Sequence, residues 1–371
     1  MKRTRRPRQV RYAIVGLGHI AQVAVLPAFA HANNSRLVAL VSGTPEKLET
    51  LSRKYRVPFT YSYEKFGDCL ESGKVDAVYI ALPNHLHRDY AVAAARARVH
   101  VLCEKPMALT EKDCEEMIEA ARDNRVRLMV AYRLHFEKAS LKALETIRSG
   151  KIGEPRIFDS VFTMQVEDEG NIRLKSETGG GPLWDIGIYC INAARFLFRS
   201  EPTEVLGCSA SRDDPRFEEV DEMTAAILRF PKERLASFTC SFGASATASL
   251  SVVGTKGELR LHSAYDYAGP HRLAVRVGEK TREREYPPRD QFAAELLYFS
   301  DCVLAGKRPE PSGREGLADV RIIRAILESA RTSKPVRLPD FERRAHPGPS
   351  QEIHRPPVEE PDLVGVVPAS E

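Results

Sequence analysis

The chain has 371 residues, of which 43% are hydrophobic and 29% are charged, so it is long enough for two globular domains. Five Lys and Arg side chains between Lys2 and Arg8 outweigh the net charge of +4, and without them it would be about −1. We therefore expect no nucleic-acid-binding face, and the apolar runs are too short to predict a membrane span. No apolar export segment follows Arg5-Arg6, so we predict a cytoplasmic protein.

The first part of the chain alternates short β-branched runs with helix-like segments. After a basic arm at residues 1–9, this alternation fills residues 10–133 and predicts βαβ units with a parallel sheet, the Rossmann arrangement. Strands are expected at residues 12–15, 37–41, 77–80, 99–102 and 128–131, and helices at residues 20–31, 45–54, 64–71, 85–96 and 111–123.

After residue 133 the pattern changes to longer alternating strands with fewer helices. Residues 134–340 are predicted to form an α+β substrate and oligomerisation domain on a large, mainly antiparallel open sheet. Residues 341–371 are rich in Pro, Glu and charge, and we predict a disordered tail. Strands are expected at residues 156–163, 204–211, 221–230, 236–242, 248–254, 257–262 and 273–277, and helices at residues 136–149, 184–198, 291–305 and 313–332.

Gly16-Leu17-Gly18-His19-Ile20-Ala21 fits the pattern G-x-G-x-x-A at the end of the first strand. The first glycine allows a tight turn, the second lets the backbone approach a pyrophosphate, and Ala21 lets the helix pack closely on the strand. Because a predicted strand precedes the motif and a predicted helix follows it, we predict a dinucleotide site.

The end of the second strand distinguishes between the two nicotinamide cofactors. A site for NAD usually has a carboxylate there, whereas this chain has Ser42-Gly43-Thr44, followed by Lys47. A hydroxyl, free amides at a helix start and a lysine suit a 2′-phosphate, so we predict NADP in preference to NAD. The alternative is that Lys47 is only a solvated helix residue, and Glu46 beside it slightly weakens the case for NADP.

Two more strands end in residues suited to the nicotinamide side of the site. Leu82-Pro83-Asn84-His85 follows the strand at residues 77–80, and Glu104-Lys105-Pro106 follows that at residues 99–102. A lysine there can stabilise charge that develops on a substrate oxygen. His85 and His87 have no third ligand at a suitable spacing, and the seven scattered cysteines lack CxxC spacing, so we predict no metal site and no disulfides.

A glycine-rich loop, Gly179-Gly180-Gly181, leads into a helix that contains Asp185 and Tyr189. Residues four apart project from the same helical face. Tyr189 could act as general acid or base if Lys105 lies nearby, with Asp185 orienting the substrate. The alternative is that Asp185 caps the helix and Tyr189 packs in the core.

Taken together, these motifs resemble the glucose-fructose oxidoreductase, inositol dehydrogenase and rhizopine-catabolism (Gfo/Idh/MocA) family. The shared landmarks are the glycine turn, Glu104-Lys105-Pro106 and Asp185-x-Gly187. Tyr189, where many members have histidine, is similar to the glucose-fructose oxidoreductase branch, as are Ser42-Gly43…Lys47, Leu82-Pro-Asn84-x-x-His87 and Tyr132-Arg133.

The resemblance implies that Lys105, Asp185 and Tyr189 surround the reacting carbon and that members form dimers or tetramers through the second sheet. Close relatives have a tryptophan before an Arg-Leu-Arg stretch, where this chain has Asn171-Ile172-Arg173-Leu174-Lys175, so the shape of their pocket cannot be carried over. Arg173 is nevertheless expected to bind substrate. The expected cofactor-binding residues are Gly16, Gly18, His19, Ile20, Ser42, Gly43, Lys47, Tyr63, Leu82, Asn84, His87, Glu104, Lys105 and Arg133.

From these residues we predict an NADP-dependent oxidoreductase that transfers a hydride to or from a sugar or polyol. A first alternative is a sugar–sugar oxidoreductase whose cofactor does not dissociate. The secreted branch of the family has an export signal that this chain lacks, so its periplasmic role does not transfer directly. A second alternative is a non-catalytic sugar or dinucleotide sensor, against which the presence of both Lys105 and Tyr189 argues.

Overall fold

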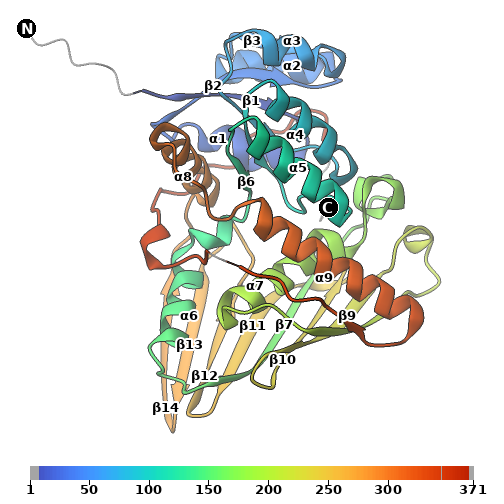
Figure 1. Cartoon of the computed structure of the whole chain (residues 1–371), viewed down its shortest axis with the longest axis vertical. Helices are drawn as coiled ribbons and strands as arrows, with labels where there is room; N and C mark the ends of the chain where they lie inside the picture. The colour runs from blue at the N-terminus through green and yellow to red at the C-terminus, as the bar shows by residue number, and fades with distance from the viewer. Residues whose placement is uncertain (1–7, 344, 367–371) are drawn as a thin grey trace, which may run out of the picture.

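The computed structural model describes residues 8–343 and 345–366, which form two sheets with their covering helices (Figure 1). Residues 1–7 of the expected basic arm and residues 367–371 of the expected tail lie outside the described residues. The smaller sheet and its helices occupy the upper part of Figure 1, and the larger sheet lies below them.

The first sheet is parallel throughout and has the strand order β3-β2-β1-β4-β5-β6. This is the doubly wound order in which ligands bind at the carboxyl ends of β1 and β4, where the direction of winding reverses. The parallel sheet predicted from the sequence is therefore confirmed, with the short β3 as an additional strand. The strands are β1 (Val10–Val15), β2 (Ser35–Val41), β3 (Phe59–Tyr61), β4 (Ala77–Ile80), β5 (His100–Cys103) and β6 (Leu128–Val130).

Helices cover both faces of this sheet, and one of them comes from far along the chain. Helix α8 (Gln291–Ala305) lies in the range expected for the second domain, yet Ser300 Oγ lies 2.7 Å from both Tyr12 Oη and Ser35 Oγ. The other helices are a π-helical turn (Ala21–Val25) continued by α1 (Leu26–Ala28), then α2 (Pro45–Tyr55), α3 (Phe66–Glu71), α4 (His87–Arg96) and α5 (Glu111–Asp123).

The second sheet has nine strands in the order β14-β13-β12-β11-β7-β10-β9-β8-β15, and only β7 and β10 pair in parallel. The predicted mainly antiparallel sheet is confirmed, and β14 and β15 are additional to the predicted strands. The strands are β7 (Pro155–Gln165), β8 (Glu204–Ala210), β9 (Met223–Phe230), β10 (Arg234–Ser241), β11 (Gly243–Gly254), β12 (Gly257–His262), β13 (His271–Val277), β14 (Lys280–Tyr286) and β15 (Val336–Arg337).

Helices α6 (Lys138–Arg148), α7 (Ile188–Phe198) and α9 (Gly313–Thr332) cover one face of the large sheet, and the opposite face is open (Figure 1). Four large apolar side chains on neighbouring strands are between 41% and 50% exposed. Leu235 pairs with Ile157, and Leu206 pairs with Ile227, so these side chains share one face of the sheet. We call this group the open-face strip.

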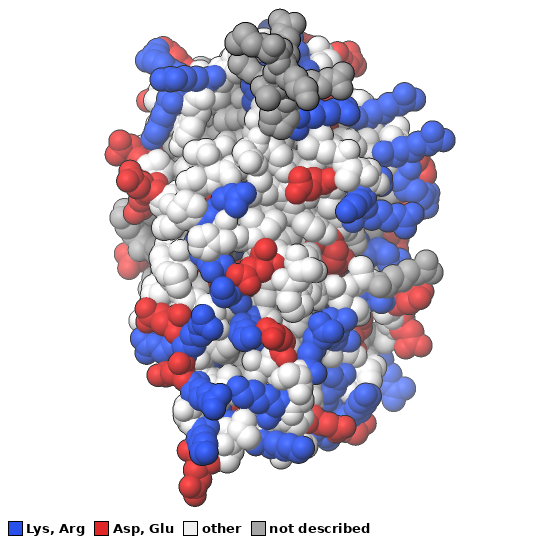
Figure 2. Space-filling view, turned by 90° about the vertical axis from the view of Figure 1, so that its left-hand side faces the viewer, with Lys and Arg blue, Asp and Glu red and all other residues white. Residues whose placement is uncertain are grey.

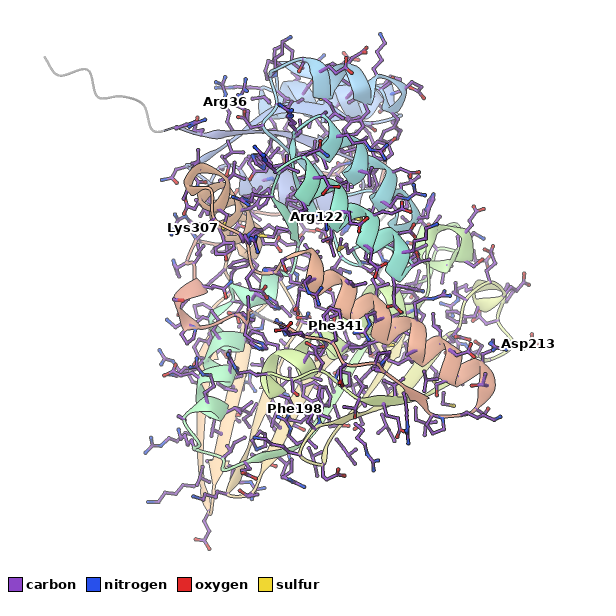
Figure 3. The ribbon with its side chains drawn as sticks, viewed as in Figure 1. Arg36, Arg122, Phe198, Asp213, Lys307 and Phe341 are labelled. Atoms are coloured by element: carbon purple, nitrogen blue, oxygen red, sulfur yellow. The ribbon has the colours of Figure 1, made fainter. Side chains whose placement is uncertain are left out.

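The described residues after α9 pack against the rest of the protein. Phe341 lies beside α9 in Figure 3, with the guanidinium carbons of Arg314 and Arg321 at 4.7 and 4.5 Å from the centre of its ring. Residues 345–366, which the sequence predicted to be disordered, then make specific contacts with the first half of the chain. Arg355 Nε, for example, donates to His31 O at 3.0 Å. Apolar residues such as Leu363 and Val364, which pack on a buried apolar cluster, distinguish this segment from a polar tail.

Acidic and basic side chains are interspersed over the face shown in Figure 2, in keeping with the nearly neutral body expected from the sequence. Among the helices of the described residues, none is both long and apolar enough to cross a membrane. Six cysteines are buried and unbridged, as expected, whereas Cys208 is exposed.

Candidate active site

The glycine turn after β1 has the geometry that a dinucleotide pyrophosphate requires. Gly16 has a φ of +92°, and a Cβ placed there would lie 2.5 Å from Ala81 O, so no other residue fits. A Cβ at Gly18 would meet no described atom within 4 Å, which leaves the backbone open to a ligand. His19 and Ile20 follow, and the π-helical turn begins at Ala21. These residues fit the phosphates of a nicotinamide dinucleotide.

The end of β2 lies beside Tyr63, as the resemblance implies. A Cβ at Gly43 would lie 3.1 Å from the Tyr63 ring, and the Tyr63 phenol, whose pKa burial raises, lies near the Ser42 hydroxyl. Lys47 lies in the first turn of α2, where burial lowers its pKa. Within the described part of the chain, no acidic side chain pairs with Lys47. The hydroxyl and this unpaired ammonium suit a 2′-phosphate.

The loop after β4 links the two halves of the molecule. Asn84 Nδ2 donates to Gly179 O at 2.8 Å, which joins this loop to the glycine-rich loop before Asp185. Leu82 is buried against Gly16. His87 is fully buried, with its ring nitrogens 2.8 Å from Leu82 O and Pro106 O, and burial lowers its pKa. His87 therefore supports the loops from behind rather than facing a ligand.

Glu104, also implied as a cofactor residue, is buried behind the strand end. Its carboxylate accepts from the Tyr79 hydroxyl at 2.7 Å and from the Lys105 amide at 3.2 Å, while burial raises its pKa. Glu295 on α8 lies within electrostatic reach of Glu104, and its fully buried carboxyl has no hydrogen-bond partner among the described residues. Burial and Glu104 raise the pKa of Glu295 well above its usual range, which favours its neutral form. No local motif pointed to Glu295 in the sequence analysis.

Lys105, Asp185 and Arg173 form one cluster at the carboxyl end of β5. Lys105 Nζ donates to Asp185 Oδ1 at 2.9 Å and to Asp185 O at 2.8 Å, and Arg173 Nε donates to Asp185 Oδ2 at 2.7 Å. Burial opposes both charges, but the ion pairs dominate: the pKa of Lys105 is raised and that of Asp185 is lowered. An ammonium and a carboxylate therefore coexist here at neutral pH.

Tyr189 lies next to this cluster, so the structure brings together the lysine and the phenol that the sequence paired. Lys105 Nζ is 4.9 Å from the centre of the Tyr189 ring. Asp185 belongs to a π-helical turn (Leu183–Gly187) that continues into α7, which carries Tyr189. Such turns within helices are frequent at functional sites. The predicted helix over residues 184–198 is therefore present, with an altered first turn.

Arg133 lies on the Tyr189 ring rather than being free to face a ligand. Its guanidinium carbon is 5.0 Å from the centre of that ring and 5.5 Å from that of Tyr267. Gln291 Oε1 and Tyr265 O each accept from Arg133 at 2.5 Å. Tyr265, Tyr267 and Gln291 lie beyond β12 and in α8, and nothing in their local sequence indicated a site. Only the folded chain brings them to Tyr189.

The site therefore combines an anion-binding turn, an ammonium ion, a paired carboxylate and a phenol. Such a group can bind a dinucleotide, stabilise charge on a substrate oxygen and exchange a proton with it. Within residues 8–343 and 345–366, no cluster of His, Cys, Asp and Glu side chains is arranged to hold a metal ion.

Comparisons with known proteins agree with this geometry. Residues 10–132 match the family model described as an oxidoreductase family with an NAD-binding Rossmann fold, and residues 140–260 match the GFO/IDH/MocA C-terminal domain. D-xylose 1-dehydrogenase [NADP(+)] of Haloarcula marismortui is 34% identical, over 89% of this chain and 93% of the relative. D-xylose 1-dehydrogenase (NADP(+)) 2 of Haloferax volcanii is 30% identical, over 88% and 99%.

A solved structure is similar over nearly the same length. The aldose-aldose oxidoreductase of Caulobacter crescentus, complexed with glycerol, is 39% identical with a TM-score of 0.85, over 89% of this chain and 100% of that one. The family predicted from the motifs is thus confirmed: the chain belongs to the Gfo/Idh/MocA oxidoreductases, which have an NAD-binding Rossmann domain.

Proposed function

We propose that the protein is an NADP-dependent oxidoreductase that transfers a hydride to or from a carbinol or carbonyl carbon of a sugar or polyol. The observation that supports this most strongly is the cluster of Lys105, Asp185 and Tyr189. The cluster lies at the carboxyl end of the parallel sheet that also bears the glycine turn. The names of the relatives, two xylose dehydrogenases and an aldose-aldose oxidoreductase, support a sugar substrate.

Each polar residue of the cluster has a distinct role in this proposal. The ammonium of Lys105 stabilises negative charge on the substrate oxygen. Tyr189 exchanges the hydroxyl proton, and Asp185 orients Lys105 and the substrate. Arg173 helps to keep Asp185 ionised and extends the substrate-binding surface. When bound, a nicotinamide ring supplies the hydride acceptor or donor.

NADP is the proposed cofactor, because the hydroxyl of Ser42 and the ammonium of Lys47, which pairs with no acidic side chain among the described residues, suit a 2′-phosphate. The names of both xylose dehydrogenases specify NADP(+). We also propose a homodimer or homotetramer that packs through the open-face strip, because a monomer would leave these apolar side chains in water.

A second candidate function is a sugar–sugar oxidoreductase in which one bound cofactor alternates between two substrates. The name of the Caulobacter crescentus enzyme favours it. Purification with cofactor already bound, and turnover of a sugar pair without added NADP, would select this candidate. A simple dehydrogenase would need free cofactor, which a panel of aldoses, ketoses and inositols with NAD and NADP would reveal.

The variant Lys105→Ala tests the proposed chemistry. We expect it to bind NADP but to lose turnover by about 10²–10³-fold, because the cation at the substrate oxygen is gone. Turnover is followed by the absorbance of the reduced cofactor, and binding by its fluorescence.

Lys112→Ala is the matched control, because the Lys112 side chain is 84% exposed on α5. Its turnover should equal that of the wild type. Ordinary turnover by Lys105→Ala would contradict the assigned role. If the wild type binds NADP but turns over no sugar in the panel, the sensor alternative gains support.

A further inference from the structure

Residues 353–366, which we call the C-terminal strap, lie along the dinucleotide-binding half of the chain. The strap begins at Ile353, whose amide donates to Phe136 O at 3.4 Å. Arg355 then joins two elements, because its carbonyl accepts from the Asp290 amide at 3.2 Å and its Nε donates to His31 O. The strap is thus fixed beside α8 and the end of α1 before it reaches the cofactor site.

The far end of the strap is tied to the helix that follows the glycine turn. Gln22 Nε2 donates to Val364 O at 2.9 Å, and the Val364 amide donates to Gln22 Oε1 at 2.8 Å. The same Nε2 donates to Leu17 O, inside the glycine turn, at 3.0 Å. One buried amide side chain therefore connects the strap directly to the turn that fits the pyrophosphate.

The strap also lies along α2, from its last turn, which bears Lys54, to its first turn, which bears Lys47 of the proposed 2′-phosphate site. Lys54 Nζ donates to Asp362 O at 3.1 Å, and a Cβ placed at Gly365 would lie 3.2 Å from Lys47 Cε. Leu363 and Val364 pack between these points on the buried apolar cluster beneath the sheet.

Between its two ends the strap faces the catalytic side of the site. The carboxylate of Glu360 lies close enough to His19 and Tyr267 to influence both. Burial lowers the pKa of His19 and raises that of Tyr267. The negative charge of Glu360 raises the pKa of both groups. The strap thus passes within electrostatic reach of both His19, in the glycine turn, and Tyr267, which lies against Arg133.

The phosphate positions beneath the strap nevertheless stay open. The space above Gly18 holds no described atom within 4 Å of a Cβ, and none of the acidic residues described in the strap pairs with Lys47. A strap that competed with the cofactor would place its carboxylates on these cationic and amide groups. This one contacts the helix faces and the aliphatic stem of Lys47, and none of its described carboxylates pairs with the Lys47 ammonium.

We propose that the C-terminal strap closes the dinucleotide site and slows release of the cofactor, so that NADP stays bound from one turnover to the next. The inference rests on the proposed binding of NADP, and it gives a structural reason for the candidate function with a retained cofactor. The strap has to open at Gln22 and α2 before the dinucleotide can leave.

The test measures NADPH dissociation by stopped-flow fluorescence, chasing the wild-type protein and its variants with excess NADP. Val364→Pro removes the amide that donates to Gln22, so release should quicken about tenfold. Val358→Pro is the matched control. It is the same substitution in the same segment, at an amide that donates no hydrogen bond to the described residues, and release should stay within about twofold of the wild-type rate.

A chain ending at Glu352 is the second variant, and its release should be at least as fast as that of Val364→Pro. Melting temperatures establish that each variant is folded. Release at the wild-type rate in both variants would refute the proposed role of the strap. Slower release from the shortened chain would also refute it, because it would mean that the strap competes with the cofactor. If the wild type binds NADPH in equilibrium titration but the variants do not behave as expected, only the proposed role of the strap is refuted. If the wild type binds no NADPH, the proposed function is refuted as well.

Discussion

Individual charged residues on α7, on α9 and in the segments that flank α9 form a network that is almost completely buried. Arg195 Nη1 lies 2.5 Å from Asp319 Oδ1 and 3.0 Å from Glu315 Oε1, and Arg343 Nη2 lies 2.8 Å from Glu315 Oε2 and 3.2 Å from Glu310 Oε1. Arg195 Nε also donates to Glu201 Oε2 at 2.6 Å, so two guanidinium groups serve four carboxyl groups. Arg195 and Arg343 lower the pKa of Glu315 to about 2 despite its burial, whereas burial and Glu315 raise the pKa of Glu310 to about 7.

This imbalance predicts that stability falls as pH rises through neutrality. The folded state holds the Glu310 proton more tightly than the unfolded chain, so the contribution is complete below about pH 4.5 and lost as pH rises through about 7. Glu310→Gln removes the titration. Between about pH 5 and 8, the free energy of unfolding of the wild type should fall relative to the variant by up to about 3 kcal/mol.

Urea denaturation at several pH values measures this difference. Glu328→Gln is the control, because Glu328 forms an exposed pair with Arg331, and its profile should follow that of the wild type. Wild-type and Glu310→Gln curves that stay parallel over the whole range would exclude a titrating Glu310.

At this scale the sequence predicted part of the site, for physical reasons. The glycine turn, Lys105 and Asp185 belong to local patterns, because a strand end or a helix start fixes where such side chains point. Tyr267, Gln291 and Glu295 follow no such pattern and reach the site only through the tertiary fold. His87 and Glu104 were correctly placed at strand ends, but the sequence could not show that their side chains turn inward.

Among the elements, the helix that bears Asp185 and Tyr189 is seated by a single glycine. A Cβ at Gly187 would lie 2.9 Å from Cys240 Sγ and 3.0 Å from Leu183 Cδ1. Only glycine at position 187 therefore lets the helix approach β10 this closely. The positions of Asp185 and Tyr189 therefore depend on the contact between this helix and the large sheet.

Gly187→Ala should destabilise the protein by about 1–3 kcal/mol, because the helix must move away from β10. Turnover should fall with it, as Tyr189 shifts relative to Lys105. Gly67→Ala is the matched control. Gly67 is an exposed glycine in α3 with nothing within 4 Å of its Cβ, where alanine should stabilise by about 0.5–1 kcal/mol. Denaturation and turnover assays on both variants test this prediction. If Gly187→Ala and Gly67→Ala change the free energy of unfolding equally, the close approach of the helix to β10 is ruled out.

The strands that the sequence missed are those without an apolar alternation. Strand β14 (Lys280–Tyr286) is exposed at all but its last residue, as an edge strand can be, and its run of charged residues resembles a loop. Strand β3 has only three residues. The long alternating strands were predicted because each has one buried and one outward face.

For the whole molecule, the open-face strip is where we expect copies of the chain to pack in a homodimer or homotetramer. Ile227 is 47% exposed and lies between Leu206 and β10, near the middle of the strip. Ile227→Glu should weaken self-association and lower the mass measured by light scattering, because it places a charge in the proposed interface. Ile172→Glu is the control, because Ile172 is equally exposed at 51% but lies off the sheet. A monomeric wild type, or unchanged mass in Ile227→Glu, would refute assembly through this face.

The packing of α8 on the first sheet affects how the gene can be divided. Residues 10–133 look self-sufficient in sequence, yet Tyr12 and Ser35 meet their hydroxyl partner only when Ser300 folds back from the other end of the chain. A fragment cut at the apparent boundary would expose the apolar surface that Ala293 and Leu296 now cover. Exchange of the second half between relatives would therefore have to bring α8 along with its matching surface.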